Sequence, residues 1–415
     1  MLIFLFTTVL LLQLNSNALL ADCSFLTTKS SKGRSVAMTL SLKRQRSAID
    51  GTNPSNDCNN YGGALRRSTR LKSQTLQSQI QQEPPRPLLT IGVVADIQYA
   101  PIPDGNSWKG APRYYRYALE QARMAAQDFQ QAKVSLVINL GDIIDGKCAK
   151  IMEHGGERHE HGVESVDHVL DALSAYTHGP IIHTYGNHEL YNLSREEISN
   201  KLNIPFVVEE PHNELVGYYS FKKHNIRFVV LDSYDIALMG RCPNTSAKRK
   251  EAERLLSLHN PNYPAQENSP EGLNGLKRRF VAFNGAVDKA QLEWLRETLH
   301  TAKSSKEKVI ILSHQPILPG SSSPLCLIWN YNDLLQIMRQ YKCTVIASFA
   351  GHAHRGGYAR DKISGIHFRV FESVLETPRP HTTYGFVDIH EDFMRVRGIG
   401  ECTSAVYDFS HMTAS

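Results

Sequence analysis

Polar side chains that could bind a divalent metal ion follow several short apolar segments of the sequence. They occur in Asp96-Ile97-Gln98, in Gly141-Asp142 with Asp145, in Asn187-His188-Glu189, in Ser313-His314 and in His352-Ala353-His354. Carboxylate, amide and imidazole ligands without a thiolate suit the harder ions Mn²⁺ and Mg²⁺. Two such ions about 4 Å apart can clamp the attacking and leaving oxygens of a phosphoryl displacement, with a carboxylate between them. The residue types therefore predict a two-metal site for phosphoryl chemistry.

Each of these motifs also has an ordinary structural interpretation when it is taken alone. Gly141-Asp142 is a common turn sequence, and a single histidine such as His314 is often packed in a core or a loop. His352 and His354, at i and i+2 between glycines, suit ligation better than packing. Every motif stands at the end of a predicted strand, and this agreement favours one common site over separate turns.

The segments that carry the motifs alternate with longer amphipathic stretches, as in an α/β domain. The strand candidates are residues 89–95, 134–140, 181–185, 309–312 and 345–350. The helix candidates are residues 114–131, 162–176, 244–258, 288–302 and 330–341. Because the carboxyl ends of parallel strands meet along one edge of a sheet, the motifs should meet there too.

Two further regions look antiparallel. Residues 218–231 form one of them, and residues 366–371 together with 385–399 form the other, with polar turn residues between the apolar runs. Residues 260–275 contain several Pro, Asn and Gly residues and are expected to form a long loop.

The first 86 residues differ in composition from the rest of the chain. They hold 11 Lys and Arg against four Asp and Glu, a surplus of +7, and because the whole chain carries +5, residues 87–415 carry −2. A body without net positive charge is not typical of a nucleic-acid binder. We expect a leader at residues 1–86, one domain at residues 87–401 and a C-terminal tail at residues 402–415.

The leader has several interpretations that the sequence leaves open. Residues 2–12 have the length of a signal-peptide core, and residues 27–72 are rich in Ser, Thr, Lys and Arg, as transit peptides are. The leader could instead be disordered, or translation could start at Met38. The cysteines of the body lack C-x-x-C spacing and favour a reducing compartment, although Asn192-Leu193-Ser194 and Asn244-Thr245-Ser246 have glycosylation spacing.

From these observations we expect a cytoplasmic monomer without a stable membrane span. An organellar or secretory location is the alternative if the leader is a functional targeting signal.

The order of the motifs resembles that of the calcineurin-like metallophosphoesterases: D-x-H, G-D-x-x-D, G-N-H-E, a lone His and G-H-x-H. The resemblance implies a four-layer α/β/β/α sandwich with a two-metal site at the strand ends. It implies one ion held by Asp96, Gln98, Asp142 and His354, and a second held by Asp142, Asn187, His314 and His352. It also implies that His188, oriented by Asp145, donates a proton or contacts phosphate near the leaving oxygen.

Two departures from the family pattern are informative. Gln98 stands where most of the superfamily has His, and its neutral oxygen favours Mn²⁺ or Mg²⁺ over iron. Gly146 stands where the protein phosphatases have Arg, which argues against phosphoprotein substrates. The strings that begin at residues 95, 113, 140, 185, 283 and 326 look like one branch, the manganese-dependent ADP-ribose/CDP-alcohol diphosphatases: ADIQY, RYYR, LGDIIDG, YGNHE, FNG and CLIWNY.

That branch implies hydrolysis of a nucleoside diphosphate linked to ribose or to an alcohol such as choline or glycerol. The products would be a nucleoside monophosphate and a phosphorylated second half, and the cofactors would be two Mn²⁺ ions, with Mg²⁺ as the alternative. Small nucleotides, and no nucleic acid, would be the partners. Four residues are similar in placement to the family's base pocket: Trp108, Phe283, Leu325 and Cys326. Ordinary packing explains these residue types equally well.

The alternatives are a cyclic-nucleotide phosphodiesterase or a general phosphatase on the same fold, and a non-enzymatic scaffold.

Overall fold

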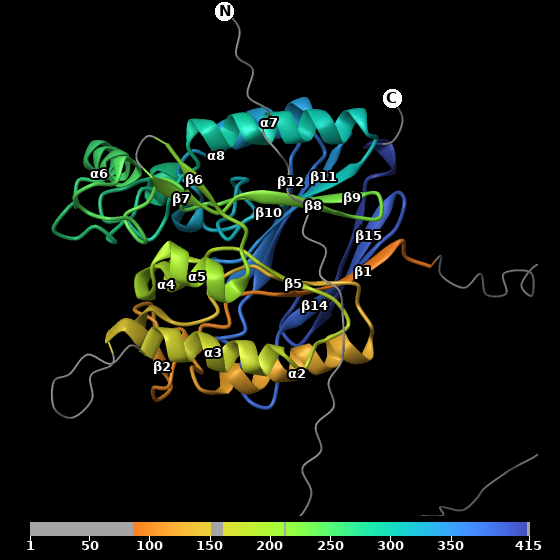
Figure 1. Cartoon of the computed structure of the whole chain (residues 1–415), viewed down its shortest axis with the longest axis horizontal. Coiled ribbons are helices and arrows are strands. Elements are labelled where there is room, and N and C mark those ends of the chain that lie inside the picture. The colour runs from red at the N-terminus through yellow and green to blue at the C-terminus, as the bar shows by residue number, and fades with distance from the viewer. Residues whose placement is uncertain (1–85, 151–160, 211–212, 413–415) are drawn as a thin grey trace, which may run out of the picture. The chain divides into compact units, whose positions relative to one another are not determined.

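The computed structural model describes residues 86–150, 161–210 and 213–412 of the chain. Two six-stranded sheets are stacked face to face in this part of the chain, with helices on both outer faces (Figure 1). The first sheet has the strand order β16-β15-β14-β1-β4-β5. Its strands are β1 (Leu89–Val94), β4 (Val137–Asn139), β5 (Ile181–His183), β14 (Tyr384–Ile389), β15 (Phe393–Ile399) and β16 (Ala405–Asp408).

The second sheet has the order β12-β13-β11-β10-β9-β8. Its strands are β8 (Tyr219–Lys223), β9 (Ile226–Val230), β10 (Lys308–Leu312), β11 (Val345–Ala350), β12 (Arg355–Arg360) and β13 (His367–Glu372). Two short hairpins lie outside the sheets: β2 (Gly105–Asn106) with β3 (Pro112–Arg113), and β6 (Val207–Glu209) with β7 (Glu214–Val216).

The helices form the outer layers. In Figure 1, α7 and α8 cover the second sheet, and α2 and α3 cover the first. The α-helices are α2 (Tyr117–Gln131), α3 (His161–Leu173), α4 (Asn187–Asn192), α5 (Arg195–Leu202), α6 (Ala247–His259), α7 (Lys289–Ser304) and α8 (Tyr331–Gln340). The short 3₁₀ helices are η1 (Gly146–Lys150), η2 (Gly275–Arg279), η3 (Pro324–Cys326) and η4 (Ser410–Met412). None of the described helices is long and apolar enough to cross a bilayer.

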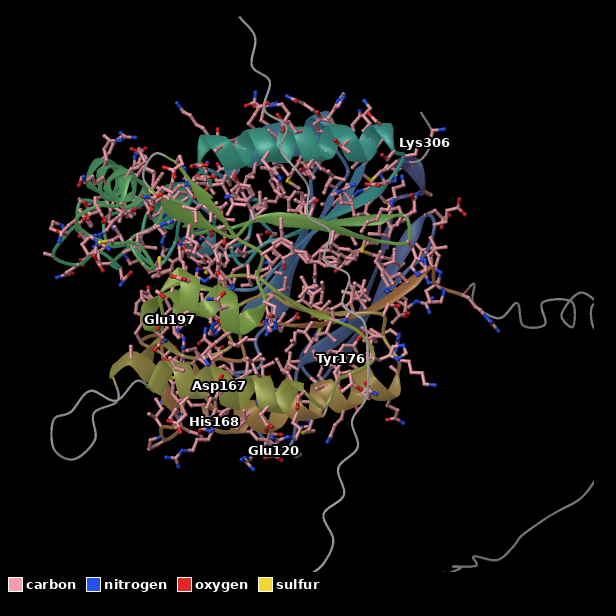
Figure 2. All side chains as sticks on the ribbon, in the orientation of Figure 1. Glu120, Asp167, His168, Tyr176, Glu197 and Lys306 are labelled. Atoms are coloured by element: carbon pink, nitrogen blue, oxygen red, sulfur yellow. The ribbon has the colours of Figure 1, made fainter. Side chains whose placement is uncertain are left out.

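The central strands are buried on both faces because each sheet is covered on both sides. Along β1, Ile91 and Val93 enter the core between the sheets, whereas Val94 packs with Phe129 in the core beneath α2 and α3. Gly92 lets α2 approach, since a Cβ there would lie 2.7 Å from the Phe129 ring. Side chains fill the space between the layers (Figure 2). This packing fixes the strand ends that carry the motifs.

The predicted α/β/β/α sandwich is confirmed in this structure. Each strand predicted to end in a motif overlaps an observed strand, namely β1, β4, β5, β10 or β11. The predicted long helices overlap α2, α3, α6, α7 and α8, and residues 218–231 contain the antiparallel pair β8 and β9.

Two predictions about the C-terminal third are corrected. Residues 366–371 do not pair with 385–399, because β13 is parallel to β11 and antiparallel to β12 in the second sheet. Of the predicted tail, residues 402–412 are described and belong to the domain, because β16 pairs with β15 and Phe409 and Met412 are buried in the core. Alternating apolar residues identify a strand but not its partner. The predicted leader, except for Arg86, lies outside the described residues.

The buried histidine of β5 gives a test of this core. His183 is 4% exposed, and burial lowers its pKa to about 4. Between about pH 6.5 and pH 4 this histidine binds a proton in the unfolded chain but not in the folded chain. The free energy of unfolding therefore falls as the pH falls. When the pH is lowered from 7 to 5, the free energy of unfolding should fall in both proteins. We expect the fall to be about 2 kcal/mol smaller in His183→Leu than in the wild type.

Urea denaturation at both pH values, with a chelator present throughout, measures this difference. Equal losses in the two proteins would contradict the assignment.

Candidate metal centre

The loops that follow the motif-bearing strands of both sheets meet at one place. The backbone N–H of His352 donates to both carboxylate oxygens of Asp96, at 3.1 and 3.0 Å. The N–H of Gln98 donates to the carbonyl oxygen of Asp142 at 2.9 Å, and the N–H of Gly351 donates to that of His314 at 3.0 Å. Backbone hydrogen bonds thus join the first motif to the second and the fourth to the fifth, and the Asp96 carboxylate joins the first to the fifth.

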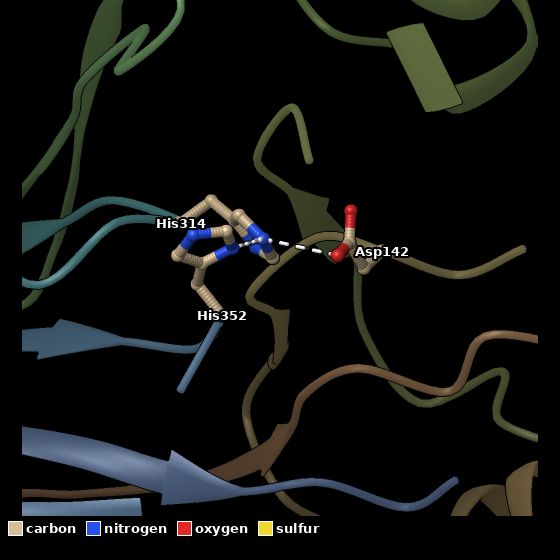
Figure 3. Close-up of side chains that lie close together, drawn as sticks. All are labelled: Asp142, His314 and His352. Atoms are coloured by element: carbon tan, nitrogen blue, oxygen red, sulfur yellow. Dashed lines mark hydrogen bonds and ion pairs between the residues drawn. The ribbon is translucent and has the colours of Figure 1, made fainter. Parts of the chain in front are cut away.

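Asp142, His314 and His352 form the centre of this region (Figure 3). His314 Nε2 lies 3.2 Å from Asp142 Oδ2 and 3.1 Å from His352 Nδ1. One ligand atom from each residue lies within 4.8 Å of the others. His314 Nδ1 lies 2.7 Å from the carbonyl oxygen of Leu140, which can only accept, so Nδ1 carries a proton and Nε2 faces the cluster.

The charges of this cluster depend on one another. Burial disfavours a charged Asp142, but His314 and His188 outweigh burial and hold the pKa of Asp142 well below its usual range. Burial also lowers the pKa of His314, but the Asp142 carboxylate raises that pKa to about 9. Burial and the neighbouring His314 charge keep the pKa of His352 well below its usual value. The Asp142 carboxylate thus favours a positive charge on His314, and a metal cation at the same place would be favoured for the same reason.

The residues fit a divalent ion. A buried carboxylate and two imidazoles converge without Lys or Arg in the group, and such ligands suit Mn²⁺ and similar ions. Metal binding would then compete with protons, as it does wherever histidines are ligands.

A second set of carboxylates differs in this respect. Glu209, Asp235 and Asp288 lie close together, but the ammonium of Lys248 contacts all of them, at 2.7 Å for Glu209 and 2.6 Å for Asp288. This lysine already supplies the positive charge, so the group is a buried ion-pair network.

Asp96, Gln98 and His354 adjoin the central cluster. Asp96 is fully buried, and its Oδ1 lies 3.6 Å from His354 Nε2. Gln98 Nε2 donates to Asp142 Oδ2 and contacts His354 Nε2, both at 3.0 Å, while Gln98 Oε1 accepts from Arg113 at 3.0 Å. The amide nitrogen of Gln98, and not its oxygen, therefore faces the cluster. Ligation through the oxygen, as the sequence predicts, requires this amide to turn over.

The third motif lies at the start of α4. The buried Asn187 accepts a hydrogen bond on Oδ1 from the hydroxyl of Tyr234 at 3.0 Å. Burial and the Asp142 charge raise the pKa of Tyr234 well above its usual value, so the hydroxyl stays a donor. Tyr234 thereby orients the amide oxygen of Asn187.

Glu189 fixes the loop that carries Asp142. Its Oε2 accepts from the backbone N–H groups of Asp142 at 3.1 Å and Gly186 at 2.9 Å, and its Oε1 accepts from Ile143. Burial and the Asp142 charge raise the pKa of Glu189 to about 8. Glu189 joins the loops of the second and third motifs.

His188 is oriented differently from the sequence prediction. The backbone N–H of Gly146 donates to His188 Nδ1 at 2.6 Å, so Nδ1 is the acceptor and Nε2 carries the proton. Asp145 Oδ2 lies 3.5 Å from the same nitrogen. Neither atom carries a proton in this tautomer, so the two do not form a hydrogen bond. The orienting group is thus the backbone of Gly146 rather than the Asp145 carboxylate, which accepts from the N–H of Lys147 at 2.9 Å.

Asn192 supports the same region. Its Nδ2 donates to the carbonyl oxygens of Asp145 at 3.1 Å and His188 at 2.7 Å. Both amide hydrogens are used within the fold, so this member of the two glycosylation tripeptides is unsuited to carry a sugar.

The backbone is strained at four of the predicted ligands. Asp96, Gln98, Asp142 and His352 have φ values of 52°, 46°, 56° and 65°, in the left-handed region that L-residues avoid. Such a conformation costs about 1 kcal/mol or more per residue and persists where the surrounding structure enforces it, often at functional sites.

The residues predicted to contact a base differ in position. Phe283 lies beside the cluster, with its ring 5.7 Å from that of His352. Leu325 is buried, and Cys326 packs against the small core of Ala350, Ala353 and Val370. Burial and the Asp96 charge raise the pKa of the Cys326 thiol to about 12.

Trp108 is 75% exposed, and the Lys109 ammonium lies 4.6 Å from its ring centre. The charge of Lys109 also acts on Cys326, which brings the Trp108 loop within electrostatic reach of the predicted pocket.

Some residues that contact the predicted ligands were given no role by the sequence. Arg113 and Asn284 lie within strings that resemble the family, and Glu376 contacts His354. Glu376 follows β13 closely, so the rule that located the other motifs, polar residues after a buried strand, would have found it. The side chains that Arg113 and Asn284 contact lie in other motifs, and sequence spacing does not reveal such contacts.

Comparisons with known proteins identify relatives of the whole domain. The sequence model of the calcineurin-like phosphoesterases matches residues 89–356. A manganese-dependent ADP-ribose/CDP-alcohol diphosphatase of Oryza sativa subsp. japonica is 41% identical over 314 residues, which are 75% of this chain and 91% of the relative. A protein of the same name from Homo sapiens is 35% identical over 334 residues, which are 78% and 93% of the two chains.

One solved structure is similar in both fold and sequence. The crystal structure of a dimetal phosphatase from Danio rerio has a TM-score of 0.71 and 33% identity to this chain. It covers 78% of this chain and 100% of that one. The similarity therefore extends over the whole of that phosphatase.

The role of Glu189 can be tested by stability. Glu189→Ala leaves the buried N–H groups of Asp142, Ile143 and Gly186 without their acceptor, and each such group costs about 1–3 kcal/mol. We expect a loss of about 3 kcal/mol or more in the free energy of unfolding, measured by urea denaturation. Glu196→Ala, on the exposed first turn of α5, is the matched control and should change stability by less than about 0.5 kcal/mol. A loss no larger than that of the control would contradict the role.

Proposed function

We propose, from the premise that this chain belongs to the calcineurin-like phosphoesterase family, that it hydrolyses the diphosphate bond of ADP-ribose and of CDP-alcohols. Water and ADP-ribose would give AMP and ribose 5-phosphate, and CDP-choline would give CMP and phosphocholine. The observation that carries the proposal is the convergence of Asp142, His314 and His352 at the joined ends of both sheets. Relatives named as manganese-dependent ADP-ribose/CDP-alcohol diphosphatases, at 35–41% identity, support the substrate class.

The proposed ligands divide into two sets that share Asp142. One ion would be held by Asp96, Gln98, Asp142 and His354, and the other by Asp142, Asn187, His314 and His352. Two Mn²⁺ ions, with Mg²⁺ as the alternative, would supply Lewis acidity toward the phosphoryl oxygens and make water at the site more acidic.

The chain itself would offer a hydrogen-bond donor to the leaving group. With Nδ1 occupied by the N–H of Gly146, His188 presents a protonated Nε2, which lies 3.8 Å from Asp142 Oδ2. The ring is 20% exposed, so this proton can reach a bound substrate. His188 would donate a hydrogen bond from this N–H to the phosphate oxygen that departs and so stabilise the charge that develops there.

The neighbours of His188 suit a small substrate. Gly146 presents no side chain, and a Cβ there would lie 3.1 Å from Tyr191 and 3.3 Å from His188. Phe283, beside His352, and Cys326 would contact the base, with Trp108 and Leu325 on the loops around them.

A substrate panel tests the proposed function. With Mn²⁺, we expect the purified chain to release nucleoside monophosphate from ADP-ribose, CDP-choline and CDP-glycerol, and to do so more slowly with Mg²⁺. Chromatography of the products measures both rates. Asp142→Ala, which removes the carboxylate shared by both ligand sets, should abolish product formation. Hydrolysis of a cyclic nucleotide or a simple phosphomonoester, without hydrolysis of these diphosphates, would favour the alternative functions and overturn the proposal.

The role of His188 has its own test. His188→Ala should lower kcat by about 10²–10³-fold, because the Nε2–H donor to the departing oxygen is lost while the proposed ligands remain. Its Mn²⁺ content, measured by atomic absorption, should stay at the wild-type level. His300→Ala, on the exposed face of α7, is the control and should leave kcat unchanged. An unchanged kcat in His188→Ala, or a loss of bound metal, would contradict a role as hydrogen-bond donor to the leaving oxygen.

The remaining expectations stay predictions: a monomer, no nucleic-acid partner and a cytoplasmic location. Removal of residues 1–86 should leave a folded, active domain.

A further inference from the structure

The two histidines of the segment His352-Ala353-His354 turn opposite ring nitrogens toward the site. His352 turns Nδ1, which lies 3.1 Å from His314 Nε2, whereas His354 turns Nε2, which lies 3.6 Å from Asp96 Oδ1. In each ring the other nitrogen contacts a side chain outside the metal-binding motifs. Because a metal ligand must offer a lone pair, the tautomer of each ring decides whether that nitrogen can bind.

Asn284 leaves His352 a single neutral tautomer. Its Nδ2 donates to the carbonyl oxygens of Arg279 at 2.8 Å and Leu325 at 2.7 Å, so both amide hydrogens are used and the amide cannot turn over. Its Oδ1, which can only accept, lies 2.8 Å from His352 Nε2. Nε2 therefore carries the proton, and Nδ1 keeps its lone pair for the site.

Glu376 selects the opposite tautomer in His354. Its Oε1 lies 2.8 Å from His354 Nδ1, and a carboxylate accepts, so Nδ1 carries the proton. Nε2 keeps its lone pair and accepts from Gln98 Nε2 at 3.0 Å. A carboxylate behind a ligating imidazole also makes the imidazole a stronger donor to a metal.

The two sides of the site consequently differ in charge. On the His354 side, Asp96 and the shared Asp142 are carboxylates, and Glu376 adds a third one behind the ring. On the other side, the shared Asp142 is the one carboxylate among the proposed ligands.

The rings on that second side also have neutral partners. The amide oxygen of Asn284 contacts His352, and the backbone carbonyl of Leu140 contacts His314.

Arg113, which donates to Gln98 Oε1 at 3.0 Å, offsets one of the three carboxylates on the His354 side and leaves a surplus of two there against one on the other side. A divalent cation gains more from the side with more negative charge.

We propose that Asn284 and Glu376 are positioning residues that make the two metal positions unequal, with the ion beside His354 held more tightly. The inference rests on the ligand sets of the proposed function. It adds that the neutral amide and the carboxylate behind the two rings set the order in which the ions bind and leave.

Titration of the metal-free full chain with Mn²⁺, followed by the electron paramagnetic resonance signal of free Mn²⁺, tests this order. The wild type should show one tight and one weaker ion. Glu376→Gln retains an acceptor for His354 Nδ1 but removes the charge, so it should weaken the tight ion about 10–100-fold and leave the weaker one unchanged. Glu307→Gln is the matched control, because Glu307 is 4% exposed and pairs with Arg227.

The reverse substitution places a charge behind the other ring. Asn284→Asp keeps an acceptor for His352 Nε2, and it should tighten the weaker ion. Asn330→Asp is its control, because Asn330 likewise donates to a backbone carbonyl, that of Val287, at 2.9 Å. Circular dichroism on every variant shows whether the fold is retained.

The outcomes separate this inference from the proposed function. Two ions of equal affinity in the wild type, or folded variants that bind Mn²⁺ as the wild type does, would overturn the inference even if ADP-ribose is hydrolysed. The predicted shifts in affinity would support it even if the substrate panel failed.

Discussion

The buried carboxylate of Asp142 is the constraint on which the rest of the site depends. At 1% exposure, an unpaired charge there would cost several kcal/mol, and neighbouring N–H groups and an imidazole offset it. Its Oδ1 accepts the N–H of His188 at 2.9 Å, and its Oδ2 faces Gln98 and His314. Glu189, in α4, accepts from the backbone N–H of Asp142 and holds the loop that carries it. The buried Asp142 charge makes a site that needs positive charge, which is why a cation suits it.

The position of this charge also joins the two sheets. Asp96 and Asp142 follow β1 and β4 of the first sheet, whereas His314 and His352 follow β10 and β11 of the second. Neither sheet carries a full set of proposed ligands. The large core between the sheets, to which both contribute, therefore determines the distance between the carboxylates and the imidazoles. Substitutions in that core would be felt at the site even where they touch no ligand.

Much of this arrangement could be predicted from the sequence because it depends on local order. An apolar run followed by Asp, Asn or His identifies a strand end, and parallel strands bring such ends to one edge. The sequence could not supply the partners of those side chains. Asn284 and Glu376 reach their histidines from distant segments, and His188 is oriented by a backbone group of Gly146. The strands with which β13 and β16 pair depend on which edge of each sheet the rest of the chain leaves unpaired. The residue pattern within β13 or β16 does not reveal this.

The left-handed backbone at Asp96, Gln98, Asp142 and His352 has an evolutionary consequence. Glycine would relax each of these positions, so the substitutions that erase the site are also those that would relieve the fold of its strain. Random drift in a lineage without use for the metal would therefore remove the backbone strain together with the ligands. The presence of four strained polar residues where glycine is easier is a mark of selection that acts on chemistry and tolerates backbone strain.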